Sequence, residues 1–378
     1  MGDDSMGAVA AMGAVAAESH RDRHWAGARL EWLLLFLAVV AVTAFRAWHC
    51  LQPPANTGDV VRHIAYGLLV GQRGLAWAAV PLTAVNRGYA WIAWSGLPYN
   101  YPVVALGFFV GVAAISPTVL AVKVALTAIE GVNALLVARV TRSRWVGVLY
   151  WAYPVSIWWV SREAQFEPLQ TLFALAALVA LRRSPAAACA LLGLAVQTKL
   201  TAGLLLPLFL ARAARGGIRP LLGAGGAFVA SFLPTALSLL AYPSVAQLVR
   251  YSAPLRYNPY YWNPSQAAMF SWNPTWLVAA DQIASYALIV GLAVALVRSS
   301  AGRLAYAAPL AFAVVLKLHT NVQFWYWLTM PVFLVAIPDR RVRTAALILL
   351  PLVDVYSIAQ LAFGPFGSTV GDYYRFMQ

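Results

Sequence analysis

Apolar segments of near membrane-spanning length recur along this chain and restrict its fold more than any other feature. They lie near residues 31–51, 119–139, 145–161, 167–182, 185–199, 200–212, 219–241, 276–298, 304–318, 324–338 and 343–363. A perpendicular helix needs about 20 residues to cross a bilayer, so several of these segments are short. Hydrophobic residues make up 61% of the 378 residues and charged residues 11%, against about 25% charged in a soluble domain. The sequence therefore predicts an all-α, polytopic transmembrane helix bundle of about eleven spans.

Basic residues set the expected orientation of these spans. The net charge is +14, but the basic side chains form short clusters between apolar segments, which is typical of membrane topology signals rather than of a nucleic-acid surface. Arg21, Arg23 and Arg29 precede the first segment and predict a cytoplasmic N-terminus. With eleven spans, the later clusters also fall on the cytoplasmic side: Arg139/Arg142/Arg144, Arg182/Arg183, Arg212/Arg215/Arg219, Arg298/Arg303 and Arg340/Arg341/Arg343. This requires residues 103–115 to form a re-entrant or interfacial element inside a first external loop from about Gln52 to Pro117.

Two regions differ in composition. Residues 1–30 contain the direct repeat Met6–Ala11 and Met12–Ala17, with acidic residues where a secretory signal would be basic, and we expect a disordered cytoplasmic tail. Residues 31–378 then form one transmembrane domain. Only Cys50 and Cys189 are present, which suggests neither a disulfide framework nor a cysteine metal site.

The first external loop begins with an amphipathic pattern over residues 59–72. Val60, Ile64 and Leu68 share one helical face, whereas Arg62, His63 and Tyr66 lie elsewhere on the helix. Such a pattern is typical of a helix that lies along a membrane surface, and this loop is therefore expected to carry amphipathic interfacial helices. Asp59 stands at the start of this helix.

Most acidic residues beyond the tail fall at or near predicted external ends: Asp59, Glu163, Glu167, Asp281, Asp354 and Asp372. Charged groups near hydrocarbon tend to line water-filled cavities, so this gathering favours an active cavity that opens outward, although a solvated loop edge explains each acid alone. Glu167 could equally compensate a helix dipole. Lys199 could bind a lipid phosphate or extend to the membrane surface, and His319 could cap a helix or bind an anion.

Five stretches resemble the GT-C superfamily of integral-membrane glycosyltransferases, which take a sugar from a polyprenyl-phosphate carrier on the non-cytoplasmic face. Gly58-Asp59, followed by Tyr66 and Gly71, resembles the family's first-loop acid motif. Tyr99-Asn100-Tyr101-Pro102-Val103 is similar to its Tyr-Pro-Pro stretch, with Val103 in place of the second proline. The stretch Ala164-Gln165-Phe166-Glu167-Pro168-Leu169-Gln170-Thr171-Leu172-Phe173 is similar to its Gly-Gln-Phe-Asp stretch, with Ala164 and Glu167 as departures. Lys199-Leu200-Thr201 and residues 319–331 resemble its later lysine and His/Gln-Tyr segments.

The resemblance implies a GT-C-like catalytic domain over residues 31–378 that performs an inverting transfer, with Asp59 as general base and mannose as the favoured sugar. It assigns the donor phosphate to Lys199, His319, Arg62 and Arg256. It assigns substrate binding to His63, Tyr99, Tyr101, Glu163, Gln165, Glu167, Tyr257, Tyr260, Trp262, Gln323 and Tyr326. Each of the aromatic residues Tyr99, Tyr101, Tyr257, Tyr260 and Trp262 taken alone fits an interfacial aromatic belt better than a sugar-binding face. No metal site is assigned, and a divalent cation is possible but not required. The partners implied are a polyprenyl-phosphate-linked sugar donor, a glycolipid or glycan acceptor and membrane lipids, with no nucleic acid.

Other functions remain open from the sequence. A lipid or solute transporter or flippase would have a similar composition, with Glu130 and Lys123 as its best residues, but we find no matching inverted halves. A noncatalytic subunit would make Asp59 only a loop acid. No HExxH, GxxxxGK, GxSxG or CxxC pattern is present. Arginine outnumbers lysine 24 to three, which favours a bacterial plasma membrane with the site facing the periplasm or exterior.

Overall fold

The structure is a computed structural model that describes residues 29–54, 57–92, 95–96, 98–99, 101–238, 240, 287, 290, 330–335, 337 and 339–348. By internal contacts the chain divides into two units, Met1–Phe45 and Arg46–Gln378. Within the described ranges the regular elements are all helices, which confirms the all-α prediction there. The predicted tail falls outside them up to residue 28.

Three of the described helices are long and apolar enough to cross a membrane. They are Arg29–Leu51, α5 (Val119–Thr141) and the stretch Ile218–Ser238, which comprises α11 (Ile218–Ser231) and α12 (Leu233–Ser238). All three coincide with predicted spans. The hydroxyl of Thr118 begins α5 by accepting a hydrogen bond from the Ala121 backbone N–H at 3.1 Å, which satisfies an otherwise unpaired first-turn donor.

The predicted span 145–161 is wrong as a single helix. It consists of α6 (Arg144–Trp151), α7 (Pro154–Ser156) and the π-helix η3 (Ile157–Arg162). Pro154 has no backbone N–H to continue α6 and instead begins the next helix, so the apolar run is broken. The run 200–212 is likewise divided, into the 3₁₀ helix η4 (Leu200–Leu205) and α10 (Leu206–Ala214).

Two further predicted spans correspond to single helices of less than spanning length. These are α8 (Glu167–Ala180) and α9 (Pro185–Val196). Near the C-terminus the structure describes α17 (Met330–Val335), within the predicted run 324–338, and helical residues 340–348, which begin three residues before the predicted run 343–363. Most of the runs 276–298 and 304–318 lies outside the described residues, so the count of eleven stays a prediction.

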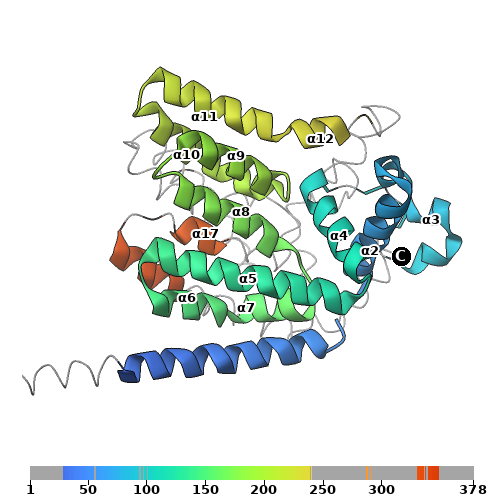
Figure 1. The fold of residues 1–378 in the computed structure, drawn as a ribbon, viewed down its shortest axis with the longest axis horizontal. Helices are drawn as coiled ribbons and strands as arrows, with labels where there is room; N and C mark the ends of the chain where they lie inside the picture. Colours follow the sequence, from blue (N-terminus) through green and yellow to red (C-terminus); the bar gives the residue numbers. More distant parts are fainter. Residues whose placement is uncertain are drawn as a thin grey trace, which may run out of the picture. The chain divides into compact units, whose positions relative to one another are not determined.

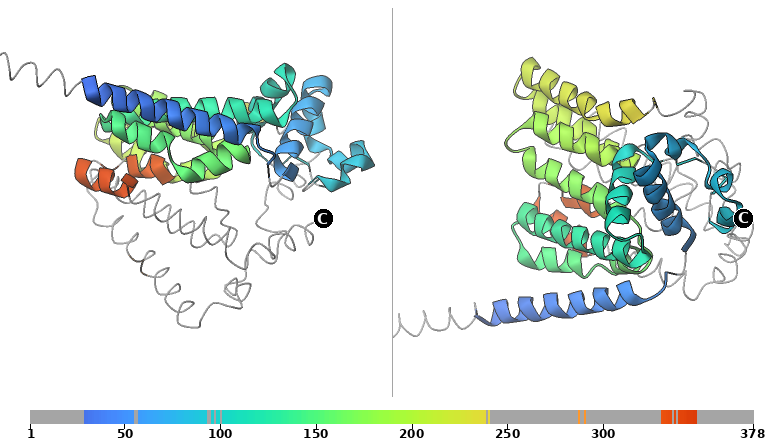
Figure 2. Two further views of the ribbon diagram at one scale, coloured as in Figure 1. Left: turned by 90° about the horizontal axis from the view of Figure 1, so that it is seen from below. Right: turned by 45° about the vertical axis from the view of Figure 1, so that its right-hand side comes forward.

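Helices α5, α8, α9 and α11 lie side by side (Figures 1 and 2). Contact between α9 and α11 is close at Gly193, where a Cβ atom would stand 1.8 Å from the Ser231 hydroxyl oxygen. The buried amide of Gln197 joins the same two helices, because its Nε2 donates to the Ser231 carbonyl at 2.6 Å. Its Oε1 accepts from the Thr235 hydroxyl, also at 2.6 Å.

A second group of helices lies at one end of this row, as Figures 1 and 2 show. It comprises α2 (Thr57–Arg73), η1 (Leu75–Ala79), α3 (Leu82–Val85), η2 (Arg87–Trp91) and α4 (Val103–Ile115). At about 1.5 Å of rise per residue, α4 is too short to cross the ~30 Å hydrocarbon core, which agrees with the predicted re-entrant or interfacial element. Helix α2 packs tightly on α4, since a Cβ atom on Gly67 would lie 2.5 Å from the Phe109 carbonyl oxygen.

The predicted amphipathic helix exists, but its polar face is buried inside the protein. Arg62, His63 and Tyr66 are as deeply buried as Val60 and Ile64. The buried polar groups find partners in the loop that follows α2, where the Arg62 guanidinium donates to the Pro98 carbonyl at 2.8 Å and the Tyr66 hydroxyl donates to the Val80 carbonyl at 3.0 Å. The polar side chains of α2 thus face the protein interior, where they can form a site.

Candidate active site

An aromatic cage surrounds His63 on α2. Its imidazole ring stacks on Phe109 from α4, with ring centroids 4.5 Å apart and planes inclined by 11°. The rings of Tyr99, Tyr101 and Phe166 meet it edge-on, with centroids 5.6, 5.1 and 5.1 Å away. His63 is buried, and its Nδ1 has no hydrogen-bond partner within the described ranges. Three segments far apart in sequence therefore meet at this imidazole.

Asp59 lies one helical turn before His63, in the first turn of α2. Its side chain is partly buried. Burial raises the pKa of the Asp59 carboxyl above its ordinary value, and the positive charges of Arg62 and Lys199 oppose part of that rise. A carboxylate with a raised pKa is a stronger base than an exposed aspartate, so this position suits proton abstraction near neutral pH.

Arg62 supplies a fixed positive charge beside the cage. In addition to its hydrogen bond to Pro98, its guanidinium carbon stands 5.6 Å from the Tyr66 ring centroid and 6.0 Å from that of Tyr99. Burial, reinforced by the charges of Arg62 and Lys199, holds the pKa of His63 well below its ordinary value. The imidazole is therefore neutral at physiological pH, so one ring nitrogen can donate a hydrogen bond and the other can accept one.

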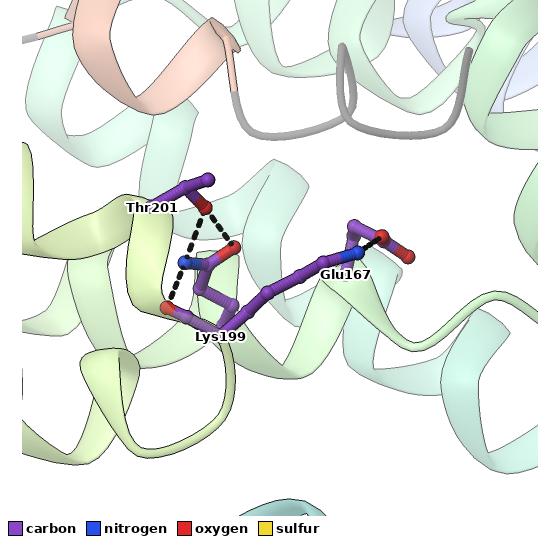
Figure 3. Close-up of polar contacts among 4 residues, drawn as sticks. Glu167, Lys199 and Thr201 are labelled. Atoms are coloured by element: carbon purple, nitrogen blue, oxygen red, sulfur yellow. Dashed lines mark hydrogen bonds and ion pairs between the residues drawn. The ribbon is translucent and has the colours of Figure 1, made fainter. Parts of the chain in front are cut away.

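Glu167 and Lys199 form a buried ion pair (Figure 3). The Lys199 ammonium also stands 5.6 Å from the centroid of Phe166, one of the rings around His63. The second carboxylate oxygen of Glu167 has no hydrogen-bond partner among the described residues. Asp59 interacts electrostatically with both members of the pair, which places the three ionisable groups in one neighbourhood.

Gln170 holds the chain around Lys199 in place, one helical turn after Glu167. Its amide nitrogen donates to the Lys199 backbone carbonyl and, at 2.8 Å, to the Thr201 hydroxyl (Figure 3). The segment that carries Lys199 is thereby tied to the helix that carries Glu167. Gln170 also borders a void lined by Thr171, Ala174, Ala202, Leu205, Val332 and Phe333, which is too narrow for a water molecule.

The backbone before Glu167 is irregular. The π-helix η3 ends at Arg162, and Ala164 then adopts a left-handed conformation with φ of 61°. This conformation is unfavourable for a residue with a Cβ atom, and both π-helical turns and such strain are common near functional sites. The turn places Phe166 and Glu167 at the cage.

Of the residues singled out from the sequence, the structure brings seven together. They are Asp59, Arg62, His63, Tyr99, Tyr101, Glu167 and Lys199. Glu163 instead lies beside Arg162, with Nε and Oε1 3.7 Å apart, and interacts with Lys123. Gln165 is buried, and its backbone N–H donates to the Trp159 carbonyl at 2.8 Å. Outside the described residues lie Arg256, Tyr257, Tyr260, Trp262, His319, Gln323 and Tyr326.

Sequence reasoning missed Phe109 and Gln170. Phe109 is one apolar residue among many in α4, and only its stacking on His63 distinguishes it. Gln170 carried a weak signal, since a polar side chain inside an apolar helix usually has a partner. No group of three or more His, Cys, Asp or Glu that could hold a metal ion occurs in the part of the chain that the structure describes.

Comparison of the chain with protein-family models, with curated proteins and with solved structures finds no match. The case for a function therefore rests on the motifs of the chain and on the way the fold gathers them.

Proposed function

We propose that this protein is a multi-pass membrane glycosyltransferase that moves a sugar from a polyprenyl-phosphate donor to a lipid-linked or glycan acceptor. One observation carries the proposal. Asp59, Tyr99, Glu167 and Lys199 come from four separate stretches that resemble the GT-C superfamily, and they lie around one buried cluster.

In the proposed reaction the acceptor hydroxyl attacks the anomeric carbon of the donor sugar. The acceptor O–H bond breaks and its proton passes to the Asp59 carboxylate, while the new C–O bond forms. The bond between the anomeric carbon and the phosphate oxygen breaks on the opposite face, so the configuration inverts. The polyprenyl phosphate leaves with the bonding electron pair.

The positive charges of the cluster suit the leaving phosphate. Arg62 is fixed by its hydrogen bond to Pro98, and a preorganised cation stabilises developing negative charge without having to reorient. Lys199 is paired with Glu167, so a donor phosphate must share this lysine with the carboxylate or displace it. Tyr101, which is partly exposed beside His63, offers an aromatic ring on which a sugar can stack, whereas Tyr99 is buried and lines the cluster behind it.

The transporter alternative gains no support from the described residues. Its best candidate, Glu130, accepts hydrogen bonds from Asn133, Tyr150 and Ser156 in the buried interior. A transport carboxylate must exchange ligands, whereas this one is fully engaged.

The proposal is tested by transfer assays on the purified protein with a panel of polyprenyl-phosphate sugars that includes the mannose donor. We expect Asp59→Asn to lower the transfer rate by at least about 100-fold, the usual contribution of a general base. Glu31→Gln removes an exposed carboxylate from the Arg29–Leu51 helix and should leave transfer unchanged. Full turnover by Asp59→Asn, or no transfer by the wild type with any donor, would contradict the proposal.

The stability of Asp59→Asn separates lost chemistry from lost folding. Because the pKa of Asp59 is raised in the folded protein, its stabilising protonated form is present at low pH and is lost as the pH rises through that pKa. Asp59→Asn should therefore unfold at the same or a higher temperature than the wild type at neutral pH. At acid pH the unfolding temperatures of the variant and the wild type should become equal.

A further inference from the structure

A second buried polar cluster lies outside the candidate active site and is centred on Glu130 of α5. Glu130 is only 2% exposed. Its Oε2 accepts hydrogen bonds from the Tyr150 hydroxyl at 3.1 Å and from the Asn133 amide at 3.0 Å, and its Oε1 accepts one from the Ser156 hydroxyl. One carboxylate thus joins α5 to α6 and α7.

Arg46 balances the charge of Glu130 through a shared hydroxyl. Its guanidinium, which is fully buried, donates to the Ser156 hydroxyl at 2.9 Å and to the Ser161 hydroxyl at 3.1 Å. It also donates to the Trp151 carbonyl at 2.9 Å. With a counter-charge and three donors, the Glu130 carboxylate is held in a single orientation, and so is the Asn133 amide bonded to it.

Asn133 connects this cluster to the candidate active site. Its Nδ2 also donates to the Pro168 carbonyl at 2.9 Å, 35 residues away in sequence. Pro168 directly follows Glu167 in the first turn of α8, and its ring fixes the local backbone torsion. The amide is completely buried, so no water competes for this bond.

We propose that Asn133, oriented by Glu130, is a positioning residue that fixes the first turn of α8 and thereby the Glu167–Lys199 pair. The hydrogen bonds of Asn133 go to Glu130 and to the Pro168 carbonyl, so its effect on the pair passes through the Pro168 backbone. The positional effect is independent of any enzymatic activity. Only its consequence for catalysis rests on the proposed glycosyl transfer.

Lysine chemistry tests the positional effect directly, because the chain has three lysines, Lys123, Lys199 and Lys317. The folded protein is treated with an amine-reactive succinimidyl ester, and labelling at each lysine is followed by peptide mass spectrometry. We expect Asn133→Leu, which keeps the side-chain size but removes both donors, to raise the labelling rate of Lys199 at least tenfold. Lys123 donates to the Gln52 carbonyl and should be labelled at the wild-type rate.

Thr141→Val is the matched control. Thr141 is also a buried polar residue of α5, but its hydroxyl donates to Val137 within the same helix at 2.7 Å. Its loss should not change Lys199 labelling. The proposal is wrong if Lys199 in a folded Asn133→Leu protein is labelled as slowly as in the wild type. It is also wrong if the labelling rates of Lys123 and Lys199 rise equally, because that would indicate a general loss of packing. If Asn133→Leu does not fold, Glu130→Gln gives the same test with a smaller expected gain.

The pH dependence of the transfer rate in Asn133→Leu tests whether the position of the Glu167–Lys199 pair matters for catalysis. The charged groups that act on Asp59 are Arg62 from α2, Glu167 from α8, and Lys199. Displacing the lysine charge should move the acid limb of the transfer rate to higher pH in Asn133→Leu, a shift that simple destabilisation does not produce. Increased Lys199 labelling in a protein that transfers no sugar would contradict the enzyme proposal and leave the positioning role intact.

Discussion

At the scale of residues, the site contains two ionisable side chains, Asp59 and His63, in surroundings that disfavour their charged forms. Asp59 is a partly buried acid with a raised pKa, and His63 is a buried base with a lowered one. Holding such groups lowers stability, and proteins tend to keep them where chemistry requires it. Ala164 belongs to the same pattern, because its left-handed backbone would suit glycine better.

The pH dependence of transfer follows from the state of Asp59. A general base works only when ionised, so the rate should fall as the pH drops through the raised pKa of Asp59, above the range of an exposed aspartate. Lys199 lowers that pKa by its positive charge, and Lys199→Gln should therefore move the acid limb to higher pH. Transfer rates of the wild type and of Lys199→Gln, measured across pH, check this prediction. If the acid limb is the same in both proteins, it reports the titration of a group other than Asp59.

At the scale of elements, the contact between α2 and α4 positions the cage, and two glycines on α2 probe it. A methyl group on Gly67 would meet the Phe109 carbonyl oxygen at 2.5 Å, whereas on Gly71 its nearest neighbour would be a Val110 methyl carbon at 3.7 Å. Gly67→Ala should lower the free energy of unfolding by about 1–3 kcal/mol through overpacking. Gly71→Ala should raise it by about 0.5–1 kcal/mol through helix propensity.

Thermal unfolding in detergent measures the change in stability of both glycine variants. Because Phe109 stacks on His63, Gly67→Ala should also reduce transfer, while Gly71→Ala should not. Equal stability of the two variants would show that the helices are less tightly packed than in the structure.

The elements differ in how well periodicity predicted them. The helices over residues 57–73, 119–141 and 167–180 follow patterns that the sequence shows plainly. The division of the run 145–161 was not predicted, because hydrophobicity does not register a proline break or a π-helical turn. Burial of the polar side of α2 was also missed, since periodicity separates faces without saying what covers each one.

At the scale of the whole molecule, the proposed orientation places the first loop outside a bacterial plasma membrane and the arginine clusters inside. Exposed single cysteines test it, because Cys50 and Cys189 are buried and give little background. In spheroplasts, a membrane-impermeant maleimide should label Gly96→Cys at once and Arg215→Cys only after permeabilisation; both positions are exposed. Labelling in the reverse order would show that the topology is inverted and that Asp59 faces the cytosol.

The sequence by itself determined the helical class, the presence near residues 29–51, 119–141 and 218–238 of helices long and apolar enough to cross a membrane, and the types of residue available for chemistry. These depend on composition and local periodicity, which act within one or two helical turns. Only the tertiary structure decided that Lys199 pairs with Glu167, that His63 stacks on Phe109 and that Asn133 reaches Pro168. Such contacts join segments tens of residues apart, and they arise from helix packing that no local pattern encodes.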